Sequence, residues 1–374
     1  KIIPFMKRTI LFAGLSLMGV LAFAQPKWMN PNVNQENRAP SRATFFAYES
    51  TDLALQAARP YEEAKDDTWG KKASSRYLSI EGKWKFNFAV DHDKAPKGFE
   101  AVDFDDSRWD RFPVPGLFEM LGYGDRIYKN AGYAWSNQFA PNPPYIEERN
   151  NYTGSYRRTF RIPADWTGMD VFMHVGSATS NLSVWVNGQY VGYSEDSKVA
   201  AEFDITRYLK PGEENLIAMQ VMRWCDGSYL EDQDFWRFTG IARECYLYAC
   251  PKARVTDLFV TPDLDKSYKN GVLNIKATTI GAEGKTLRFT LRDADGKQVA
   301  TQTVSGTAEV SLQLKAAGCK KWTAETPYLY TLIAEVLDGG NVVEVIPQRV
   351  GFRKVEIKNA QLLVNGQTVL FKGA

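Results

Sequence analysis

The segment from Arg223 to Ile241, RWCDGSYLEDQDFWRFTGI, places four carboxylates among five aromatic rings. A solvated loop does not need the rings, and a core strand does not need the charge. Rings pack on the faces of sugars, and ionised carboxylates accept hydrogen bonds from hydroxyls or ligate hard cations. Ligand binding is therefore one possible role of the segment. Its four acids are Asp226, Glu231, Asp232 and Asp234.

Three interpretations of these acids remain open from the residues alone. A glycosidase needs two carboxyl groups, about 5–5.5 Å apart for retention or about 6.5–9.5 Å for inversion, and Glu231 with Asp234 could form such a pair. Nearby arginines argue against this, because they keep carboxylates ionised whereas a catalytic acid needs a raised pKa. The other interpretations are salt-bridged acids that fix a loop and ionised acids that bind a ligand. The arginines are Arg223, Arg237 and Arg243.

The length and charge of the chain narrow its function class. Its 374 residues exceed what one core usually serves, so about two to three domains are expected. With 46 basic and 44 acidic residues the net charge is only +2, and we expect no nucleic acid partner. The sequence contains no GxSxG, P-loop, HExxH or dinucleotide-binding pattern.

The N-terminus predicts a signal peptide of bacterial type over residues 1–24. MKRTILFAGLSLMGVLAFAQ joins a basic start to an apolar run that ends in the small-x-small pattern AFA. Lys1 cannot initiate translation, so Met6 is the expected start and residues 1–5 are interpreted as upstream read-through. Neither this run nor any later one is long enough to span a membrane. We expect an exported chain, periplasmic or secreted, that begins at Gln25.

The cysteines and histidines do not predict a zinc centre. No CxxC pair occurs, and His92 and His174 lie far apart. Cys245 and Cys250 lie five apart on one predicted strand, so they face opposite sides and should not pair. We expect His174 to be a satisfied histidine rather than a base, and the cysteines to be free, buried thiols. These thiols are Cys225, Cys245, Cys250 and Cys319.

Short alternating or apolar runs follow one another over residues 76–250, a pattern typical of a sandwich or jelly roll. Within them, Asn187-Gly188 predicts a two-residue hairpin. Residues 25–75 are polar and are interpreted as an extended arm with a turn of helix before Pro60.

Three further segments complete this organisation. Gly116–Gly154 is expected to be a long loop that is functional rather than disordered, because it is rich in Tyr and Trp. Residues 251–353 contain short strands spaced as in an immunoglobulin-like sandwich, with no cluster of reactive side chains. Residues 354–374 are expected to begin a new element.

These motifs resemble one known family. RWCDGSYLEDQDFWRFTGI is similar to the sugar-binding domain of glycoside hydrolase family 2 β-galactosidases. The resemblance extends, in the family's order, from about Asn30 to the end of the chain. The other segments that carry it are SRYLSIEGKWKFNFA, FDDSRWDRFPVPG, IYKNAGYAW, VWVNGQYVGYSEDSK, EFDITRYLKPGEENLIAMQV, KKWTAETPYLYTL, VGFRKVEI and LLVNGQTVLFKGA.

The resemblance implies an all-β chain. A jelly-roll sugar-binding domain is followed by an immunoglobulin-like β-sandwich, and the chain ends at the start of a (β/α)8 barrel. In the family both catalytic Glu residues belong to that barrel, so this chain is expected to hold no catalytic residue, and the Glu pair is expected beyond residue 374. The whole protein is then a retaining β-galactosidase acting on terminal β-D-galactosyl residues, and it could be a homo-oligomer. This chain alone is expected to be inactive.

Two residues are implicated in substrate binding by the resemblance. Asn130 matches an Asn of the family's IYTN loop, and Asp234 matches the Asp that precedes the aromatic pair in LEDQD. The Asn amide both donates to and accepts from galactose hydroxyls. The Asp carboxylate is similar to the family's ligand for a sodium ion that touches the sugar, as suits a hard cation.

A second implied site is similar to the family's structural magnesium site. Asn30, Glu195 and Asp226 match its ligands, with a backbone carbonyl expected near Val33. The sequence departs from the family in two places: Lys27 stands where a carboxylate is expected, and Glu195 replaces an amide. A lysine ammonium at this position could take the cation's place.

Two alternatives remain beside the β-galactosidase interpretation. One is a stand-alone carbohydrate-binding β-sandwich protein without chemistry, although we expect such a module to end on a closed strand rather than on the apolar LFKGA. The other is a related β-glucuronidase or β-mannosidase. YLEDQDFWR favours galactose, because the Asp matching the sodium ligand resembles that branch of the family.

Overall fold

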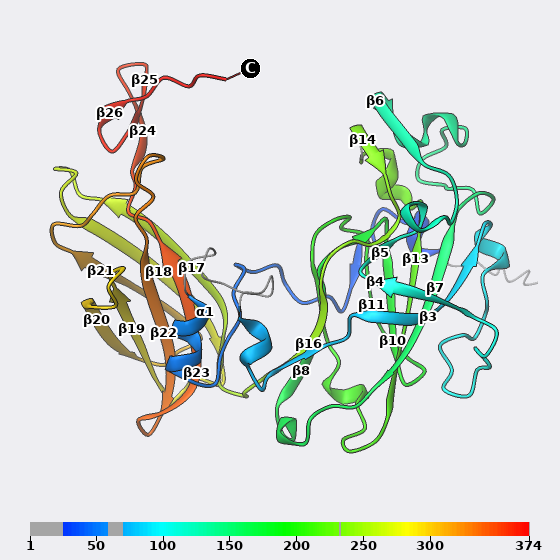
Figure 1. Ribbon diagram of the computed structural model, residues 1–374, viewed down its shortest axis with the longest axis horizontal. Helices are drawn as coiled ribbons and strands as arrows, with labels where there is room; N and C mark the ends of the chain where they lie inside the picture. The colour runs from blue at the N-terminus through cyan, green and yellow to red at the C-terminus, as the bar shows by residue number, and fades with distance from the viewer. Residues whose placement is uncertain (1–24, 59–69, 232, 374) are drawn as a thin grey trace, which may run out of the picture.

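The computed structural model describes residues 25–58, 70–231 and 233–373. Within these ranges the chain forms two β-sandwiches that lie side by side, and residues 251–253 lead from the first into the second (Figure 1). The predicted all-β class is confirmed. The predicted signal peptide and Asp232 lie outside the described residues.

The N-terminal sandwich has the two opposed sheets of the predicted jelly roll, and every strand pair in them is antiparallel. The larger sheet has the order β1 (Gln35–Glu36), β11 (Gln189–Ser194), β10 (Leu182–Val186), β13 (Asn215–Met222), β7 (Thr153–Phe160), β3 (Gly82–Ala89) and β4 (Asp110–Val114). The smaller sheet has the order β12 (Ala201–Asp204), β8 (Asp170–Val175), β16 (Cys245–Cys250) and β2 (Tyr77–Ser79).

Alternating burial along these strands places one set of side chains in a common core. Strand β8 alternates buried and half-buried positions over its whole length, as a sheet with one face inward requires. Trp84, Phe118 and Tyr156 are fully buried at the centre. The predicted hairpin is confirmed, since Asn187 and Gly188 both have positive φ between β10 and β11.

The second sandwich has the immunoglobulin-like arrangement of two antiparallel sheets around its own core. One sheet contains β17 (Arg254–Leu264), β18 (Gly271–Ile280) and β21 (Glu309–Ala316) in that order. The other contains β20 (Gln298–Ser305), β19 (Thr286–Arg292), β22 (Tyr330–Asp338) and β23 (Asn341–Val350) in that order.

The N-terminal arm contacts both sandwiches. Strand β1 extends the larger jelly-roll sheet beside β11, and the backbone of Tyr48 exchanges hydrogen bonds of 2.8 and 2.9 Å with Val345 on β23. The expected turn of helix is α1 (Thr51–Ala57), which is capped by the Ser50 hydroxyl and packs against β22 and β23.

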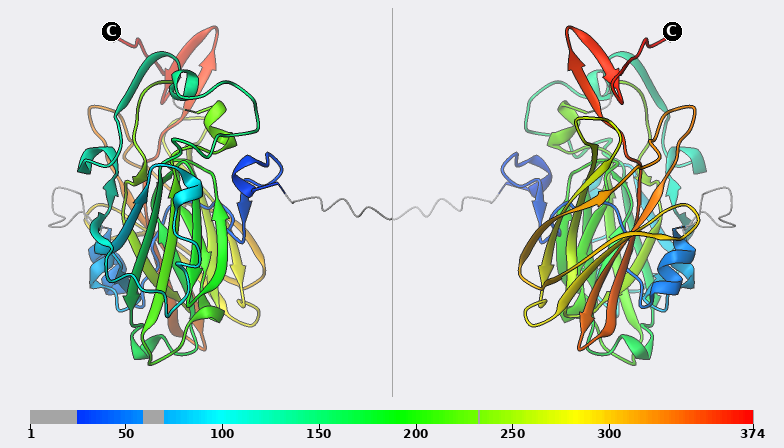
Figure 2. Two further views of the ribbon diagram at one scale, coloured as in Figure 1. Left: turned by 90° about the vertical axis from the view of Figure 1, so that its right-hand side faces the viewer. Right: turned by 90° about the vertical axis from the view of Figure 1, so that its left-hand side faces the viewer.

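The last described residues form a small sheet of β24 (Val355–Lys358), β25 (Gln361–Val364) and β26 (Gln367–Thr368). This sheet projects from the same end of the molecule as β6 (Ile127–Tyr133) and β14 (Gln233–Arg237), as Figure 1 and Figure 2 show. Large apolar side chains at this end are exposed, including Ile357 and Phe371.

Two further expectations can be checked in the described residues. All four cysteines are free; Cys225, Cys245 and Cys250 are buried, as predicted, whereas Cys319 is only half-buried. No described helix has both the length and the apolar character needed to cross a membrane.

Candidate functional site

Strands β6 and β14 bring the two predicted substrate-binding residues to one two-stranded sheet. The prediction of loops over Gly116–Gly154 and around Asp234 was wrong at these places, because each segment finds its strand partner about a hundred residues away in the sequence. Phe235 pairs with Lys129 and Gln233 with Tyr133. The register shift between these pairs is a β-bulge at Asp234, opposite the stretch that contains Asn130.

Asp234 is exposed on this bulge and has a φ of 52°, a left-handed conformation that Asp tolerates better than most residues. The Tyr128 hydroxyl donates a hydrogen bond of 3.3 Å to its Oδ1. Asn130, two residues from Tyr128 on β6, is also exposed. An amide and a carboxylate therefore face solvent from adjacent strands, with oxygen atoms that can accept hydrogen bonds or ligate a cation.

Tyr128 is a site residue that the sequence analysis missed. It lies two positions before Asn130 on a strand, so both side chains are on the same face of β6. The strand period could have indicated this relation, but only if Gly116–Gly154 had been recognised as containing a strand.

The arginines of the segment do not clamp Asp234. Buried Arg223 pairs with Asp125 at 3.3 Å, and Arg237 donates to the Arg223 carbonyl at 2.5 Å. Arg237 also lies 3.8 Å from Glu231, whose carboxylate accepts a hydrogen bond of 2.8 Å from Ser197. Glu231 thus fixes the local loop, which agrees with the interpretation of salt-bridged acids for this residue.

These contacts do not favour catalysis by Glu231 and Asp234. A glycosidase pair faces one scissile bond across a gap, and its acid requires a raised pKa. Glu231 is turned toward Ser197 and Arg237, whereas Asp234 contacts Tyr128 at the surface. The geometry supports ligand binding at Asp234 and a structural role for Glu231.

Aromatic rings line the surface beside the bulge. Trp224 is buried, whereas Phe235 and Trp236 keep 47% and 48% of their surface exposed. Trp236 stacks on Phe238 with ring centroids 5.7 Å apart, and the Tyr128 ring lies 5.2 Å from Trp236. This exposed aromatic face next to Asp234 has the character of a sugar-binding surface.

A second cluster lies deeper in the jelly roll, where Glu195, Cys225 and Asp226 have ligand atoms within 4.8 Å of one another. Tyr193 donates its hydroxyl to Glu195. Burial, together with the negative charge of Asp226, raises the pKa of Glu195 to about 9. Burial also raises the pKa of the Cys225 thiol, so the thiol stays protonated and is a poor ligand.

The two carboxylates of this cluster fit a divalent cation. Oδ2 of Asp226 is buried with no hydrogen-bond partner among the described residues, and two acids in one buried site repel each other unless a proton or a cation lies between them. The arm runs beside them, since the Glu195 amide donates to the Asn34 carbonyl at 3.0 Å. Asn30 lies four residues earlier on this arm.

Lys27 does not occupy this cluster. Its ammonium pairs with Glu36 and lies 4.0 Å over the Tyr190 ring. The idea that this lysine takes the place of the cation is therefore wrong. Asn30 Oδ1 accepts hydrogen bonds from the backbone and the side chain of Asn32 at 3.2 and 3.4 Å.

The sequence matches family models over both sandwiches. A model described as the sugar binding domain of glycosyl hydrolases family 2 covers residues 77–251, and a second model, described as glycosyl hydrolases family 2, covers residues 253–353. The chain belongs to this family. The resemblance inferred from its motifs is thus confirmed.

Curated family 2 relatives extend well beyond this chain. It is 37% identical over 361 residues to a beta-galactosidase from Priestia megaterium, a match that covers 93% of this chain and 34% of that protein. It is 41% identical over 299 residues to a beta-galactosidase from Streptococcus thermophilus, which covers 79% of this chain and 29% of that protein. The chain therefore spans about a third of the length of these relatives.

Two solved structures share the fold. A glycosyl hydrolase family 2 member from Bacteroides cellulosilyticus superposes with a TM-score of 0.62 at 22% identity, over 80% of this chain and 39% of that one. A β-glucuronidase from Ruminococcus gnavus gives a TM-score of 0.61 at 22% identity, over 79% of this chain and 49% of that one.

Proposed function

We propose that this chain is the N-terminal part of an exported, retaining β-galactosidase, and that it contributes one wall of the substrate site while the catalytic Glu pair lies in a barrel beyond residue 374. One observation carries the proposal: Asp234 and Asn130 are exposed on paired strands beside an aromatic face. Relatives named beta-galactosidase, similar over most of the chain, support the substrate class.

In this proposal Asp234 binds the sugar edge and a sodium ion, and the Tyr128 hydroxyl holds its carboxylate in place. A bound sodium ion would supply a fixed positive charge for a galactose hydroxyl. The Asn130 amide would donate to one hydroxyl and accept from another. Trp236 would cover the apolar face of the ring or of a neighbouring sugar.

Glu195 and Asp226 would hold a magnesium ion with a purely structural role, assisted by Asn30 and the Val33 carbonyl on the arm. The unpartnered Asp226 oxygen and the closeness of the two acids support this assignment. The ion would supply the positive charge that two adjacent carboxylates lack. It would also tie the arm to the jelly roll.

The proposal is tested by expressing the chain alone and together with whatever the reading frame encodes after Ala374. The chain alone is expected to hydrolyse no aryl β-galactoside, because the catalytic Glu pair is proposed to lie beyond residue 374. The longer protein is expected to hydrolyse the galactoside faster than the matching glucuronide or mannoside. Turnover by the pure chain, or a preference for either other sugar, would refute the assignment.

Magnesium is expected to stabilise the chain. A hundredfold excess of ion over its Kd should raise the free energy of unfolding by about 2.7 kcal/mol, since the ion binds only the folded state. Thermal unfolding with MgCl2 and with EDTA measures the effect, and Asp226→Asn should abolish it. Asp103→Asn changes an exposed acid elsewhere and should preserve the stabilisation by magnesium. Equal melting temperatures with and without the ion would disprove the site.

A further inference from the structure

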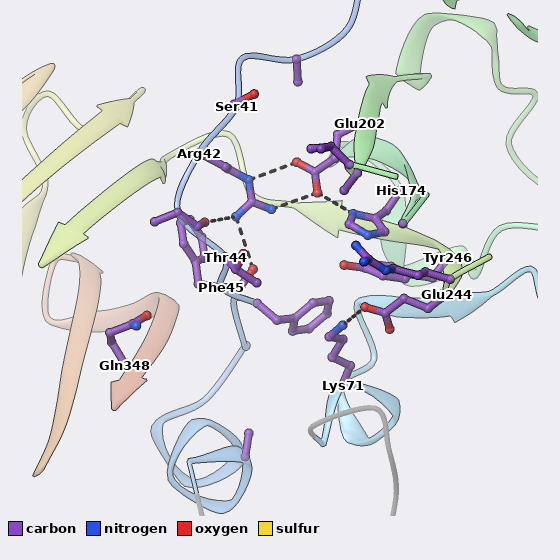
Figure 3. Close-up of a pocket in the computed structure, with 18 of the residues that line it drawn as sticks. Ser41, Arg42, Thr44, Phe45, Lys71, His174, Glu202, Glu244, Tyr246 and Gln348 are labelled. Atoms are coloured by element: carbon purple, nitrogen blue, oxygen red, sulfur yellow. Dashed lines mark hydrogen bonds and ion pairs between the residues drawn. The ribbon is translucent and has the colours of Figure 1, made fainter. Parts of the chain in front are cut away.

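Buried charged groups join the arm to the jelly roll beside a cavity of about 720 Å³ between the two sandwiches (Figure 3). The Arg42 guanidinium donates two hydrogen bonds of 3.1 Å to Glu202, and the same carboxylate lies 2.9 Å from Nδ1 of His174. The His174 ring stacks on Tyr246 with ring centroids 4.4 Å apart, so this residue is a satisfied histidine, as expected. A guanidinium that donates to the carboxylate of a distant segment thus fixes one part of the chain on another.

A second contact of this kind lies at the start of β6. Arg223 directly follows β13 and is fully buried, and its guanidinium donates to the Asp125 carbonyl at 2.9 Å and to the two carboxylate oxygens at 3.3 and 3.5 Å. The Tyr152 hydroxyl donates to the same carboxylate. Although burial alone would raise it, these two partners lower the pKa of Asp125. The carboxylate is therefore ionised, and charge-assisted hydrogen bonds are roughly twice as strong as neutral ones.

The chain around Asp125 is packed closely against the Tyr152 ring. Gly124 has a φ of 77°, and a Cβ atom at this position would lie 2.2 Å from Cε2 of Tyr152. Only glycine permits so close an approach. The centroid of the same ring lies 4.3 Å from the guanidinium carbon of Arg223. The ring and the guanidinium together restrict where Asp125 can lie.

Arg223 is also bonded to the other strand of this sheet. Its carbonyl accepts a hydrogen bond of 2.5 Å from Arg237, the last residue of β14. Arg237 is paired with Ile127, the first residue of β6, and Asp125 lies two residues before Ile127. One buried residue next to the jelly-roll strand β13 therefore holds both strands at the same end of their sheet.

The sheet of β6 and β14 depends on such contacts because it has only two strands. Among the described residues neither strand pairs with a third, and two strands are marginally stable on their own. The sheet projects from the jelly roll, as Figure 1 shows. Tyr128 lies three residues after Asp125, so a shift at the start of β6 moves its hydroxyl relative to the Asp234 carboxylate. Misplacement by about 1 Å can cost an enzyme about 100-fold in rate.

We propose that Asp125 is a positioning residue of the galactoside site. Arg223 and Tyr152 hold its carboxylate, and the carboxylate fixes the start of β6. Strand β6 then places the Tyr128 hydroxyl against the Asp234 carboxylate. This role rests on the proposed function, and it requires no contact between Asp125 and the sugar.

Steady-state kinetics of Asp125→Ala in the longer protein test this role. The KM for an aryl β-galactoside and the sodium concentration for half-activation are each expected to rise about tenfold, while kcat falls less than about threefold. An aspartate with a merely structural role would lower the amount of active enzyme, and so the apparent kcat, but would leave both constants unchanged. Unchanged constants in the variant of an active wild type would overturn the role of Asp125. A wild type that hydrolyses no galactoside would instead refute the proposed function.

Two further variants complete the kinetic test. Asp125→Asn keeps an acceptor oxygen for Arg223 and Tyr152, so it should recover part of the loss. Asp338→Ala is the matched control, because Asp338 also pairs with a cation, Lys285 at 2.7 Å, and its side chain has the same 55% exposure as that of Asp125. Asp338 lies on β22 of the second sandwich, and its replacement should change neither constant.

Hydrogen exchange of the chain alone tests the same contact without any galactosidase activity. In Asp125→Ala the amides of β6 are expected to exchange at least about tenfold faster, because the start of the strand is released, whereas the amides of β7 in the jelly-roll sheet keep their wild-type rates. Wild-type rates in β6 would overturn the inference whatever the kinetics show. Equal acceleration of β7 would indicate a general loss of stability and would also overturn it.

Discussion

Replacing Asp234 with alanine in the longer protein is expected to lower kcat/KM for an aryl β-galactoside by about 100-fold and to abolish the response of the rate to sodium. The variant removes the charged acceptor of a sugar hydroxyl together with the proposed sodium ligand, and hydrogen bonds to charged groups contribute roughly 1.5–3 kcal/mol each. Initial rates measured with sodium and with potassium at equal ionic strength provide both readouts.

Controls for this variant must separate the effect of losing the carboxylate charge from the effect of straining the backbone. Alanine at a φ of 52° is strained, whereas asparagine tolerates that conformation, so Asp234→Asn removes the charge and preserves the bulge. The sodium response should be lost in both variants. Asp103→Ala, at an exposed acid far along the chain from β14, should change neither rate nor sodium response. An unaltered KM and sodium response in Asp234→Asn would refute the assignment.

Replacing Glu344 with glutamine is expected to stabilise the chain by on the order of 3 kcal/mol at pH 8–9 and by less than about 1 kcal/mol at pH 5. Glu344 is buried on β23, where its carboxylate accepts a hydrogen bond of 2.8 Å from the Val255 amide. Burial raises its pKa from 4.5 to about 7, in spite of the Val255 bond and nearby arginines that lower it.

The number of protons bound in the folded and unfolded states determines how the stability contribution of Glu344 changes with pH. Between pH 4.5 and pH 7 the folded chain holds a proton on Glu344 that the unfolded chain has released, so this group's contribution to stability falls as the pH rises through that interval. Glutamine stays neutral and can still accept from Val255 through its carbonyl oxygen. Chemical unfolding from pH 5 to pH 9 measures the effect. The exposed Glu309→Gln serves as control, and a wild type as stable as Glu344→Gln at pH 9 would contradict the prediction.

Much of the fold could be predicted from local pattern. The Asn187-Gly188 hairpin, the alternating strand β8 and the short helix α1 each depend on neighbouring residues, through turn conformation, strand period and helix capping. The two sandwiches followed from strand spacing and from the resemblance to the family. At these places local preference and tertiary structure agree.

The candidate site was predicted only in part, because its scaffold is non-local. Asn130 and Asp234 were identified by resemblance, but β6 and β14 were interpreted as loops. Neither strand alternates cleanly, since Asp234 is a bulge and β6 is mostly exposed. Tyr128 and the true partner of Lys27 were missed for the same reason: each contact joins segments brought together by the tertiary fold.

The path of the arm has a consequence for how the molecule is assembled. Residues 25–58 are synthesised well before their docking partners, since β11 ends at Ser194 and Val345 lies on β23. During synthesis β1 cannot pair before β11 has emerged, and Tyr48 cannot pair before β23 has emerged, when nearly all of both sandwiches is complete. The arm then adds an edge strand to the jelly roll and pairs through Tyr48 with the second sandwich. The relative placement of the two sandwiches is therefore fixed late in folding.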